Sequence, residues 1–286
     1  MNPWLNVHNG DLAQAEALLR LNEPYCVGAA YRFLKRGKKD RLWKNKDGSA
    51  LLLYARRILF PVFRSAAFPS SLIKNEGLIL PRFFSFIGKK LHAAQGLASD
   101  MDLMEAGMEA RGFFSTAGFE YDLMNWDRAQ DRIPARWNVP VPPRLTIRQA
   151  DGLDLERLFP LQLGYEAEEV LPEGAALNPE SVRNGLKAIL LGFYTLTAEM
   201  DGRLVGKINI NAESFSRFQI GGVYVAPDYR GQGIAGALTR EIIRRLLPKG
   251  KRFSLFVKKN NAAARSVYDK IGFAPIGDYR IRYYHP

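Results

Sequence analysis

A glycine-rich turn between an apolar segment and an amphipathic one is the feature of this sequence best suited to chemistry. The apolar segment is Gly221-Gly-Val-Tyr-Val225, and apolar side chains recur at helical spacing from Ile234 to Leu247. The first N–H groups of a helix lack partners and lie at the positive end of its dipole, which suits a pyrophosphate group. The residues of the turn are Arg230, Gly231, Gln232, Gly233, Ile234 and Ala235.

The glycines of this turn have a simpler interpretation as well. Gly231 and Gly233 let the backbone approach an anion without an intervening Cβ, but they would serve equally in a tight strand-to-helix connection. Other chemistry finds less support in the residue types. One cysteine, Cys26, excludes an internal disulfide framework, and the three histidines lack metal-ligand spacing, so we expect no metal site.

Two motifs at the right separation resemble the GNAT superfamily of N-acetyltransferases. Arg230-x-x-Gly233-x-Ala235 matches the acyl-CoA pyrophosphate signature Gln/Arg-x-x-Gly-x-Gly/Ala, placed after a strand as in that family. Downstream, Asn261-x-x-Ala264-x-x-x-Tyr268-x-x-Ile271-Gly272-Phe273 is similar to the family's late helix. The resemblance covers residues 144–286.

The resemblance implies a cofactor site and a reaction. The strand that carries Val223, Tyr224 and Val225 would diverge from residues 253–257, and the pantetheine arm of acetyl-CoA, as co-substrate, would bond to its free edge. Asn261 would lie near this arm and Tyr268 near the sulfur. Tyr268 is therefore the candidate general acid for the departing thiolate, although a tyrosine on an amphipathic helix can also be a core residue.

The general base is not evident from the sequence. Family members often carry a carboxylate on the strand before the turn, but residues 218–227 contain no Asp or Glu, and Gln219 cannot take a proton. An acidic group, Glu166, Glu168 and Glu169, follows the first helix of this region, which usually lines the acceptor pocket in the superfamily. We therefore take Glu168 and Glu169 as catalytic candidates for a cationic amine, with solvent-exposed carboxylates as the alternative.

A proline-rich segment predicts the domain boundary. Pro134, Pro140, Pro142 and Pro143 forbid a continuous helix or a central strand, so we expect domains at 1–135 and 144–286 joined by a linker at 136–143. The second domain reads as strands at 145–149, 193–200, 203–212, 218–226, 253–257 and 278–284, with helices at 151–170, 178–191, 234–247 and 262–271. This is a mixed α/β (α+β) pattern, and the resemblance implies a GNAT-type, mostly antiparallel sheet flanked by helices.

The first 135 residues carry no phosphate-loop signature but have a similar order of elements. We expect helices broken at Pro24, a hairpin around Asp47-Gly48, helical segments at 83–96 and 98–111, and a short strand at 121–126. The offset of 154 residues between Asp47-Gly48 and Asp201-Gly202 recurs between Gly118-Phe119 and Gly272-Phe273. We predict a degenerate second copy of the fold that has lost CoA binding.

Charge and composition limit the partners. The net charge is +12, and a basic stretch from Arg32 to Lys46, with Asp40 as its one acidic residue, could hold phosphates of an acceptor or RNA or be a solvated loop. No apolar run reaches the ~20 residues of a membrane span, and Met1–Gln14 shows no targeting signal, so we expect a cytoplasmic protein without membrane partners.

The leading function is acetyl transfer from acetyl-CoA to a primary amine of a small molecule or peptide. Two alternatives stay open: an acyl-CoA-binding sensor or interaction module, which the missing strand carboxylate permits, and an aminoacyl transferase that uses charged tRNA, against which the intact CoA motif argues. The acceptor, the acyl-chain preference and the oligomeric state are not encoded in these motifs.

Overall fold

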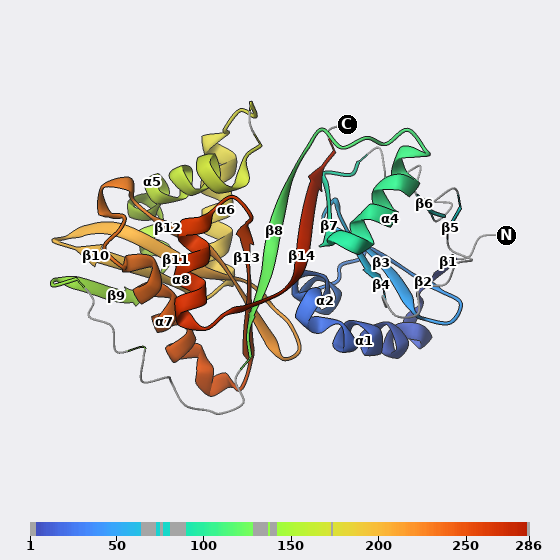
Figure 1. Ribbon diagram of the computed structural model, residues 1–286, viewed down its shortest axis with the longest axis horizontal. Helices are drawn as coiled ribbons and strands as arrows, with labels where there is room; N and C mark the ends of the chain where they lie inside the picture. Colours follow the sequence, from blue (N-terminus) through green and yellow to red (C-terminus); the bar gives the residue numbers. More distant parts are fainter. Residues whose placement is uncertain are drawn as a thin grey trace. The chain divides into compact units, whose positions relative to one another are not determined.

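The chain folds into two compact units that do not follow the order of the sequence. The computed structural model describes residues 4–63, 73–74, 77–80, 90–127, 137, 142–172 and 174–284. Unit 1 comprises Met1–Leu123, Val257–Lys259 and Pro275–Pro286, and unit 2 comprises Met124–Phe256 and Asn260–Ala274. Each unit contains its own mixed α/β arrangement (Figure 1).

Unit 1 is built on a mixed sheet with the strand order β1-β2-β3-β4-β7-β14, continued by the first part of β8. Its strands are β1 (Trp4–Asn6), β2 (Arg41–Asn45), β3 (Ala50–Ala55), β4 (Ile58–Phe63), β7 (Ala93–Leu97), β8 (Ala117–Trp126) and β14 (Ala274–Tyr283), and its helices are α1 (Leu12–Leu21), α2 (Val27–Leu34) and α4 (Ala98–Glu109). The short strands β5 (Ile73–Lys74) and β6 (Gly77–Leu78) pair separately.

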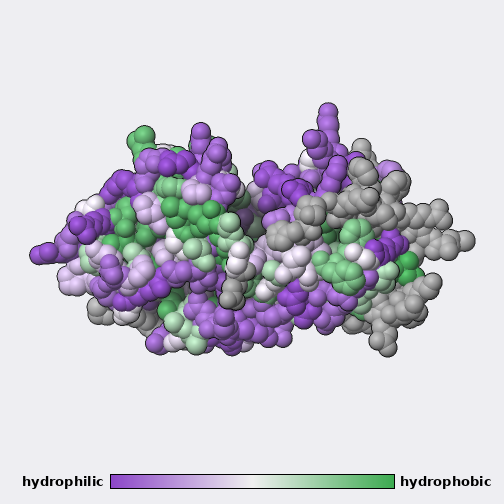
Figure 2. All heavy atoms as spheres, turned by 90° about the horizontal axis from the view of Figure 1, so that it is seen from above, coloured by the Kyte–Doolittle hydropathy of each residue, from purple (hydrophilic) through white to green (hydrophobic). Residues whose placement is uncertain are grey.

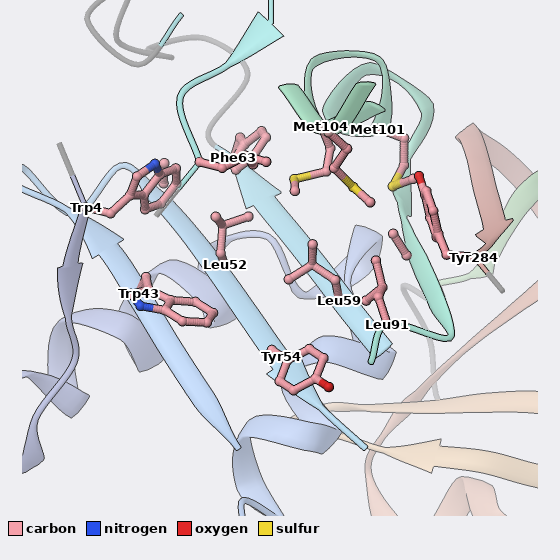
Figure 3. Packing of buried hydrophobic residues seen from close by; sticks show 14 residues of the cluster. Trp4, Trp43, Leu52, Tyr54, Leu59, Phe63, Leu91, Met101, Met104 and Tyr284 are labelled. Carbon is pink, nitrogen blue, oxygen red and sulfur yellow. The ribbon is translucent and has the colours of Figure 1, made fainter. Parts of the chain in front are cut away.

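The core of unit 1 lies between this sheet and α4. Leu52 of β3 and Leu59 of β4 are fully buried, and Met101 and Met104 project from α4 toward the sheet (Figure 3). Nearly every side chain of the apolar strands β3 and β4 is buried, as in strands that are covered on both faces.

The strand β14 belongs to unit 1, although its sequence follows the whole of unit 2. It pairs antiparallel with β7 from Tyr279↔Leu97 to Tyr283↔Ala93. Arg280 and Arg282 of this strand both contact Glu105 of α4 and Glu120 of β8, which fixes the strand through charge as well as through the ladder. The expected domain at 144–286 therefore differs from the observed unit at its C-terminal end, because hydrophobic alternation identifies a strand but not the sheet edge that it joins.

Unit 2 has the strand order β13-β12-β11-β10-β9, with the last residues of β8 on the other side of β13. Its strands are β9 (Leu145–Gln149), β10 (Thr195–Met200), β11 (Arg203–Glu213), β12 (Arg217–Val225) and β13 (Arg252–Lys258), and its helices are α5 (Leu155–Tyr165), α6 (Pro179–Gly192), α7 (Ile234–Leu246) and α8 (Ala262–Ile271). The pairs from β9 to β12 are antiparallel, whereas β12 and β13 are parallel.

Two neighbouring residues of β11 show that helices cover both faces of this sheet. A Cβ on Gly206 would lie 3.1 Å from Leu238 of α7, whereas the Nζ of Lys207 lies 4.6 Å from the ring centroid of Tyr165 at the end of α5. Since adjacent strand residues point to opposite faces, α5 covers one face and α7 the other. In Figure 2, hydrophilic side chains alternate with hydrophobic groups on the coloured part of one molecular face.

Most of the expected elements of residues 144–286 are confirmed. Asn178 caps α6 by accepting from the backbone N–H of Ser181 at 3.0 Å, and Asp201-Gly202 forms the turn of the β10–β11 hairpin. In unit 1, the helices around Pro24, the Asp47-Gly48 hairpin and the helix at 98–111 are also present. The helical expectation at 83–96 is wrong for residues 93–96, which lie in β7. Residues 83–89 and most of the expected linker at 136–143 lie outside the described residues.

The two units share several connections. In each unit a hairpin with an Asp-Gly turn is followed by an antiparallel strand, and that strand pairs in parallel with the next long one, β4 with β7 and β12 with β13. In unit 1 this parallel pair covers only Ile58↔Ala93 and Leu59↔Ala94. These features agree with a degenerate second copy, which stays a prediction.

Beyond this short parallel pair, atoms of β7 and of the start of α4 lie against the rest of β4. A Cβ on Gly96 of β7 would lie 3.2 Å from the ring of Pro61 on β4, and the Asp100 carboxylate accepts from the N–H of Phe63 at 3.2 Å. Pro61 also has no N–H to offer. Neither Pro61 nor Phe63 therefore offers a free N–H at this strand edge.

None of the helices that the structure describes has the length and apolar character needed to span a bilayer.

We expect Tyr279→Ala in β14 to destabilise unit 1 selectively. The side chain is 2% exposed, and large aromatic-to-alanine changes in a core cost about 3–5 kcal/mol. Native-state hydrogen exchange should show faster exchange in β7 and α4. As a matched control, Phe253→Ala, at a fully buried position of β13, should instead accelerate exchange in β12. Faster exchange in β12 than in β7 after Tyr279→Ala would contradict the assignment of β14 to unit 1.

Candidate functional site

The strands β12 and β13 diverge part of the way along their length. Their parallel pairing runs from Arg217↔Arg252 to Ile220↔Leu255 and extends no further in the described part of the chain. On its other edge, β12 pairs with β11 at Asn209↔Gly221 and again at Lys207↔Tyr224, so Ile208 faces two residues, Gly222 and Val223. This is a β-bulge, which bends a strand and increases its twist, and it lies where the pairing with β13 stops.

The two glycines at the bulge make room for amide side chains. An ideal Cβ on Gly221 would lie 1.9 Å from the Nδ2 of Asn211, and one on Gly222 would lie 2.0 Å from the Oδ1 of Asn209. Gly222 also has a φ of +57°, which side chains other than glycine adopt at a cost. The glycine pair is therefore required by its surroundings, because polar side chains of β11 occupy the space over it on the face of the sheet covered by α5.

The turn before α7 presents unpaired backbone donors. Gly231 and Gly233 have φ values of +76° and +79°, and Gly233 occupies the N-cap position without a capping side chain. Among the described residues, no backbone acceptor is recorded for the N–H groups of residues 231–236, whereas the N–H of Ala237 donates to the carbonyl of Gly233. A helix start of this kind is suited to an anion, and the binding of a diphosphate there stays a prediction.

The side chain of Arg230 has other partners. Its Nη2 donates to both carboxylate oxygens of Glu168, at 2.8 and 3.0 Å, and its Nε donates to the carbonyl of Val225 at 3.0 Å. The hydroxyl of Tyr224 donates to the same Glu168 at 2.6 Å. We name this cluster of Tyr224, Glu168 and Arg230 the clamp. It connects the end of β12 and the start of the turn to the π-helical turn Glu166–Val170 that follows α5.

The electrostatics of the clamp are consistent with a structural ion pair. Burial acts to raise the pKa of Glu168, but hydrogen bonds from Tyr224 and Arg230 outweigh it and hold the pKa below its ordinary value. Burial and the bond to Glu168 raise the pKa of Tyr224 to about 12. Glu168 is therefore an ionised carboxylate satisfied by two donors and is poorly suited to take a proton at neutral pH.

The remaining acidic candidates lie on the same turn. Glu169 accepts from the Nδ2 of Asn261 at 3.1 Å, while the Oδ1 of Asn261 caps α8 by accepting from the N–H of Ala264 at 3.0 Å. Glu166 accepts from Gln162 at 2.8 Å. Asn261 is thus a link between α8 and the turn after α5, and the structure brings Glu168, Glu169 and Asn261 into one region of unit 2.

Tyr268 lies buried on α8, with 7% of its surface exposed. Its ring packs edge-on against Phe273 at a centroid distance of 5.9 Å. Burial, and to a smaller extent Tyr165 and Glu169, raises the pKa of Tyr268 well above its ordinary value. The phenol therefore keeps its proton across the physiological range, as a proton donor requires, and Tyr165 and Glu169 are its near neighbours.

Two lysines at the end of β13 have partners within unit 1. Lys259 forms an ion pair with Asp278 at 2.7 Å, and the Nζ of Lys258 lies 4.2 Å from the ring centroid of Phe119. In the basic stretch of unit 1, Lys44 is likewise paired with Asp11 at 2.9 Å.

Lys207 is a buried residue of this region that neither sequence motif includes. It is 1% exposed, and its Nζ donates to the carbonyl of Gly222 at 2.9 Å. The available signal was the alternation Lys207-x-Asn209-x-Asn211, which places three polar side chains on one face of an otherwise apolar strand.

The geometry defines a domain that offers free main-chain donors both along a strand edge and at the start of a helix. Comparison with known proteins specifies its class. Residues 165–273 match the model of the acetyltransferase (GNAT) family, and the chain therefore contains a GNAT-family domain.

Curated relatives cover only parts of the chain. It is 31% identical over 84 residues to an acetyltransferase of Pectobacterium atrosepticum, covering 28% of this chain and 57% of that protein. It is 36% identical over 151 residues to the mycothiol acetyltransferase of Saccharomonospora viridis, covering 45% and 48%. The chain thus spans about half the length of the curated relatives that it matches.

Solved structures resemble the chain over nearly its full length. A GCN5-related N-acetyltransferase from Sphaerobacter thermophilus has a TM-score of 0.57 at 18% identity, covering 99% of this chain and 95% of that one. A GCN5-related N-acetyltransferase-like protein from Streptococcus suis has a TM-score of 0.56 at 15% identity, with 96% and 99% covered. At these identities the similarity establishes the fold.

We expect Gly222→Ala to be more destabilising than an ordinary left-handed glycine replacement. The added Cβ would overlap Asn209 and adopt an unfavourable φ, for a combined cost of about 2–4 kcal/mol. Gly174→Ala is the matched control, because Gly174 has a φ of +78° and no atom within 4 Å of an added Cβ. Chemical denaturation measures both. Equal losses of folding stability, about 1 kcal/mol in each variant, would show that the side chains around Gly222 tolerate a Cβ.

Proposed function

We propose that this chain is an N-acetyltransferase that uses acetyl-CoA and a primary amine of a small molecule or peptide. The observation that carries the proposal is the divergence of β12 from β13 beside a helix start with unpaired donors, within residues that match the GNAT family. A long ligand with an amide-containing arm and a diphosphate would satisfy both groups of donors.

The binding residues act mainly through their backbones. The edge of β12 at Val223, Tyr224 and Val225 has no β13 partner and can bond to the amides of a pantetheine arm. The N–H groups from Gly231 to Ala235 can bind the diphosphate, with Gln232 and Ile234 contributing main-chain atoms only. The side chain of Arg230 supports this turn through the clamp instead of being a free charge.

The chemistry requires a bond from the amine nitrogen to the thioester carbonyl carbon and release of the thiolate. N–H groups at the bulge can stabilise the negative charge that develops on the carbonyl oxygen. Tyr268, held neutral by burial, donates a proton to the departing sulfur. The acetyl group ends on nitrogen, which gives up one proton to a base or to water, and CoA leaves as the free thiol.

The two glutamates have different roles in this proposal from those that the sequence suggested. Glu168 positions the turn and β12 through the clamp. Glu169 positions α8, and with it Tyr268, through Asn261. Both are therefore positioning residues, and the negative charge of Glu169 also favours the approach of a cationic amine.

Calorimetry with acetyl-CoA, followed by CoA release on adding spermidine, lysine, kanamycin or trialanine, tests the proposal. Binding followed by turnover with at least one amine is expected. Binding without turnover would favour an acyl-CoA sensor, and the absence of binding would contradict the proposed cofactor site.

We expect Gly233→Ala to weaken acetyl-CoA binding by about 10-fold, because a Cβ would stand between the backbone donors and the diphosphate. Gly250→Ala is the matched control: Gly250 has a φ of +70°, has open space around it, and lies at the other end of α7. Both variants should lose similar folding stability, about 1 kcal/mol. A similar loss of affinity in the two variants would argue against a diphosphate at this turn.

Tyr268→Phe should lower kcat by about 100-fold or more without changing the Kd for acetyl-CoA, because it removes the proton donor and leaves the packing against Phe273 intact. Steady-state kinetics and calorimetry measure the two quantities. An unchanged kcat would assign Tyr268 to the core alone.

A further inference from the structure

Lys207 lies at the point where the bulge displaces β12. Its Nζ donates to the carbonyl of Gly222 at 2.9 Å. Both this Nζ and the Oδ1 of Asn209 lie within 3.0 Å of the position that a Cβ on Gly222 would take. The lysine therefore lies with Asn209 against the bulge, beside the strand edge to which the pantetheine arm is assigned.

Beside Lys207, the described part of the chain contains a hydrogen-bond acceptor without a partner. The Oδ1 of Asn209 is buried and unsatisfied, although its Nδ2 donates to Asn211 at 2.7 Å. Buried acceptors without a partner are rare and costly, and a donor that enters during function is one way to satisfy them. An amine nitrogen that carries N–H groups is such a donor.

The surroundings of Lys207 contain few charges. Tyr165 of α5 covers it with the face of its ring, and among the described residues Glu166 of the following π-helical turn is the carboxylate whose charge acts on it. On β12 the neighbouring Tyr224 is bonded to Glu168, and on β10 the register partner is the uncharged Thr197. In the described part of the chain no carboxylate lies within ion-pair distance of Lys207. A buried ammonium without a paired carboxylate is unfavourable.

This environment favours the neutral form of the Lys207 side chain. Burial lowers the pKa of Lys207 to about 7, and the charge of Glu166 opposes this only in part. Below this pH the side chain is an ammonium and cannot accept a proton. Above it the side chain has a free lone pair, and a base with a pKa near the working pH is the most effective.

We infer that Lys207 takes the proton from the acceptor amine, in place of the carboxylate that β12 lacks. The inference rests on the proposed acetyltransferase function. As the nitrogen bonds to the carbonyl carbon and the C–S bond breaks, the amine proton passes to Nζ of Lys207, directly or through one water, and Tyr268 protonates the sulfur. Exchange with solvent returns Lys207 and Tyr268 to their starting protonation states. Asn209 accepts the second N–H of the amine.

Substitutions separate a base from a group that only supports the bulge. Lys207→Gln keeps an N–H donor for the Gly222 carbonyl but cannot take a proton, and Lys207→Met keeps neither. We expect both to lower kcat by about 100-fold or more while the Kd for acetyl-CoA stays within about threefold. Lys187→Gln, at an exposed lysine of α6, is the matched control and should behave like the native chain. Recovery of native kcat in Lys207→Gln relative to Lys207→Met would overturn the inference in favour of a positioning role.

The pH profile provides the second readout. With the amines named above as probes, kcat/KM should rise through a limb near pH 7, well below the pKa of a free alkylamine, and this limb should disappear in Lys207→Gln. Retention of the limb in that variant would overturn the inference.

A direct titration is independent of any acceptor. Carbon NMR of the lysine Cε atoms, with Lys207→Gln to assign the signal, should show one lysine that titrates near pH 7. A Lys207 signal that stays protonated above pH 9 would overturn the inference even if turnover is observed. Conversely, a neutral Lys207 in a chain that does not bind acetyl-CoA would count against the proposed function.

Discussion

The hydrogen-bond ladder between β12 and β13 stops at Ile220↔Leu255, and the organisation of unit 2 depends on this interruption. A continuous ladder would satisfy every strand amide and leave no edge for a ligand. The bulge at Gly222 and Val223 prevents this, because it turns the strand before the pairing can continue. The bulge in turn is stabilised by atoms outside the ladder: the Gly222 carbonyl has Lys207 as a donor, and the glycines leave space for Asn209 and Asn211.

The clamp explains how the strand edge and the helix start remain in one arrangement. Glu168 accepts from Tyr224, which belongs to β12, and from Arg230, which begins the turn before α7. The π-helical turn that carries Glu168 also carries Glu169, which bonds to the cap residue of α8. One short segment after α5 therefore contacts three elements of the site, and π-turns of this kind are frequent at functional sites.

The sequence predicted the parts of this site that depend on local rules. Glycines at 231 and 233 indicate left-handed backbone before a helix, Asn178-Pro179 indicates a helix start, and Asp201-Gly202 indicates a hairpin, and all are present. It could not predict that Arg230 is paired with Glu168, since these residues are distant in the chain. The sequence also did not indicate that β14 joins β7, because a half-buried alternating strand fits any open sheet edge of suitable register.

The assignment of β14 to unit 1 has a consequence for biosynthesis. A ribosome makes the sequence of unit 2 before it makes β14. During that interval the edge of β7 that later pairs with β14 is exposed. Unpaired strand edges in partly folded chains promote aggregation. The acidic residues Glu105 and Glu120, which pair with Arg280 and Arg282 once β14 arrives, would carry unpaired negative charge during this wait and so discourage premature association with other chains.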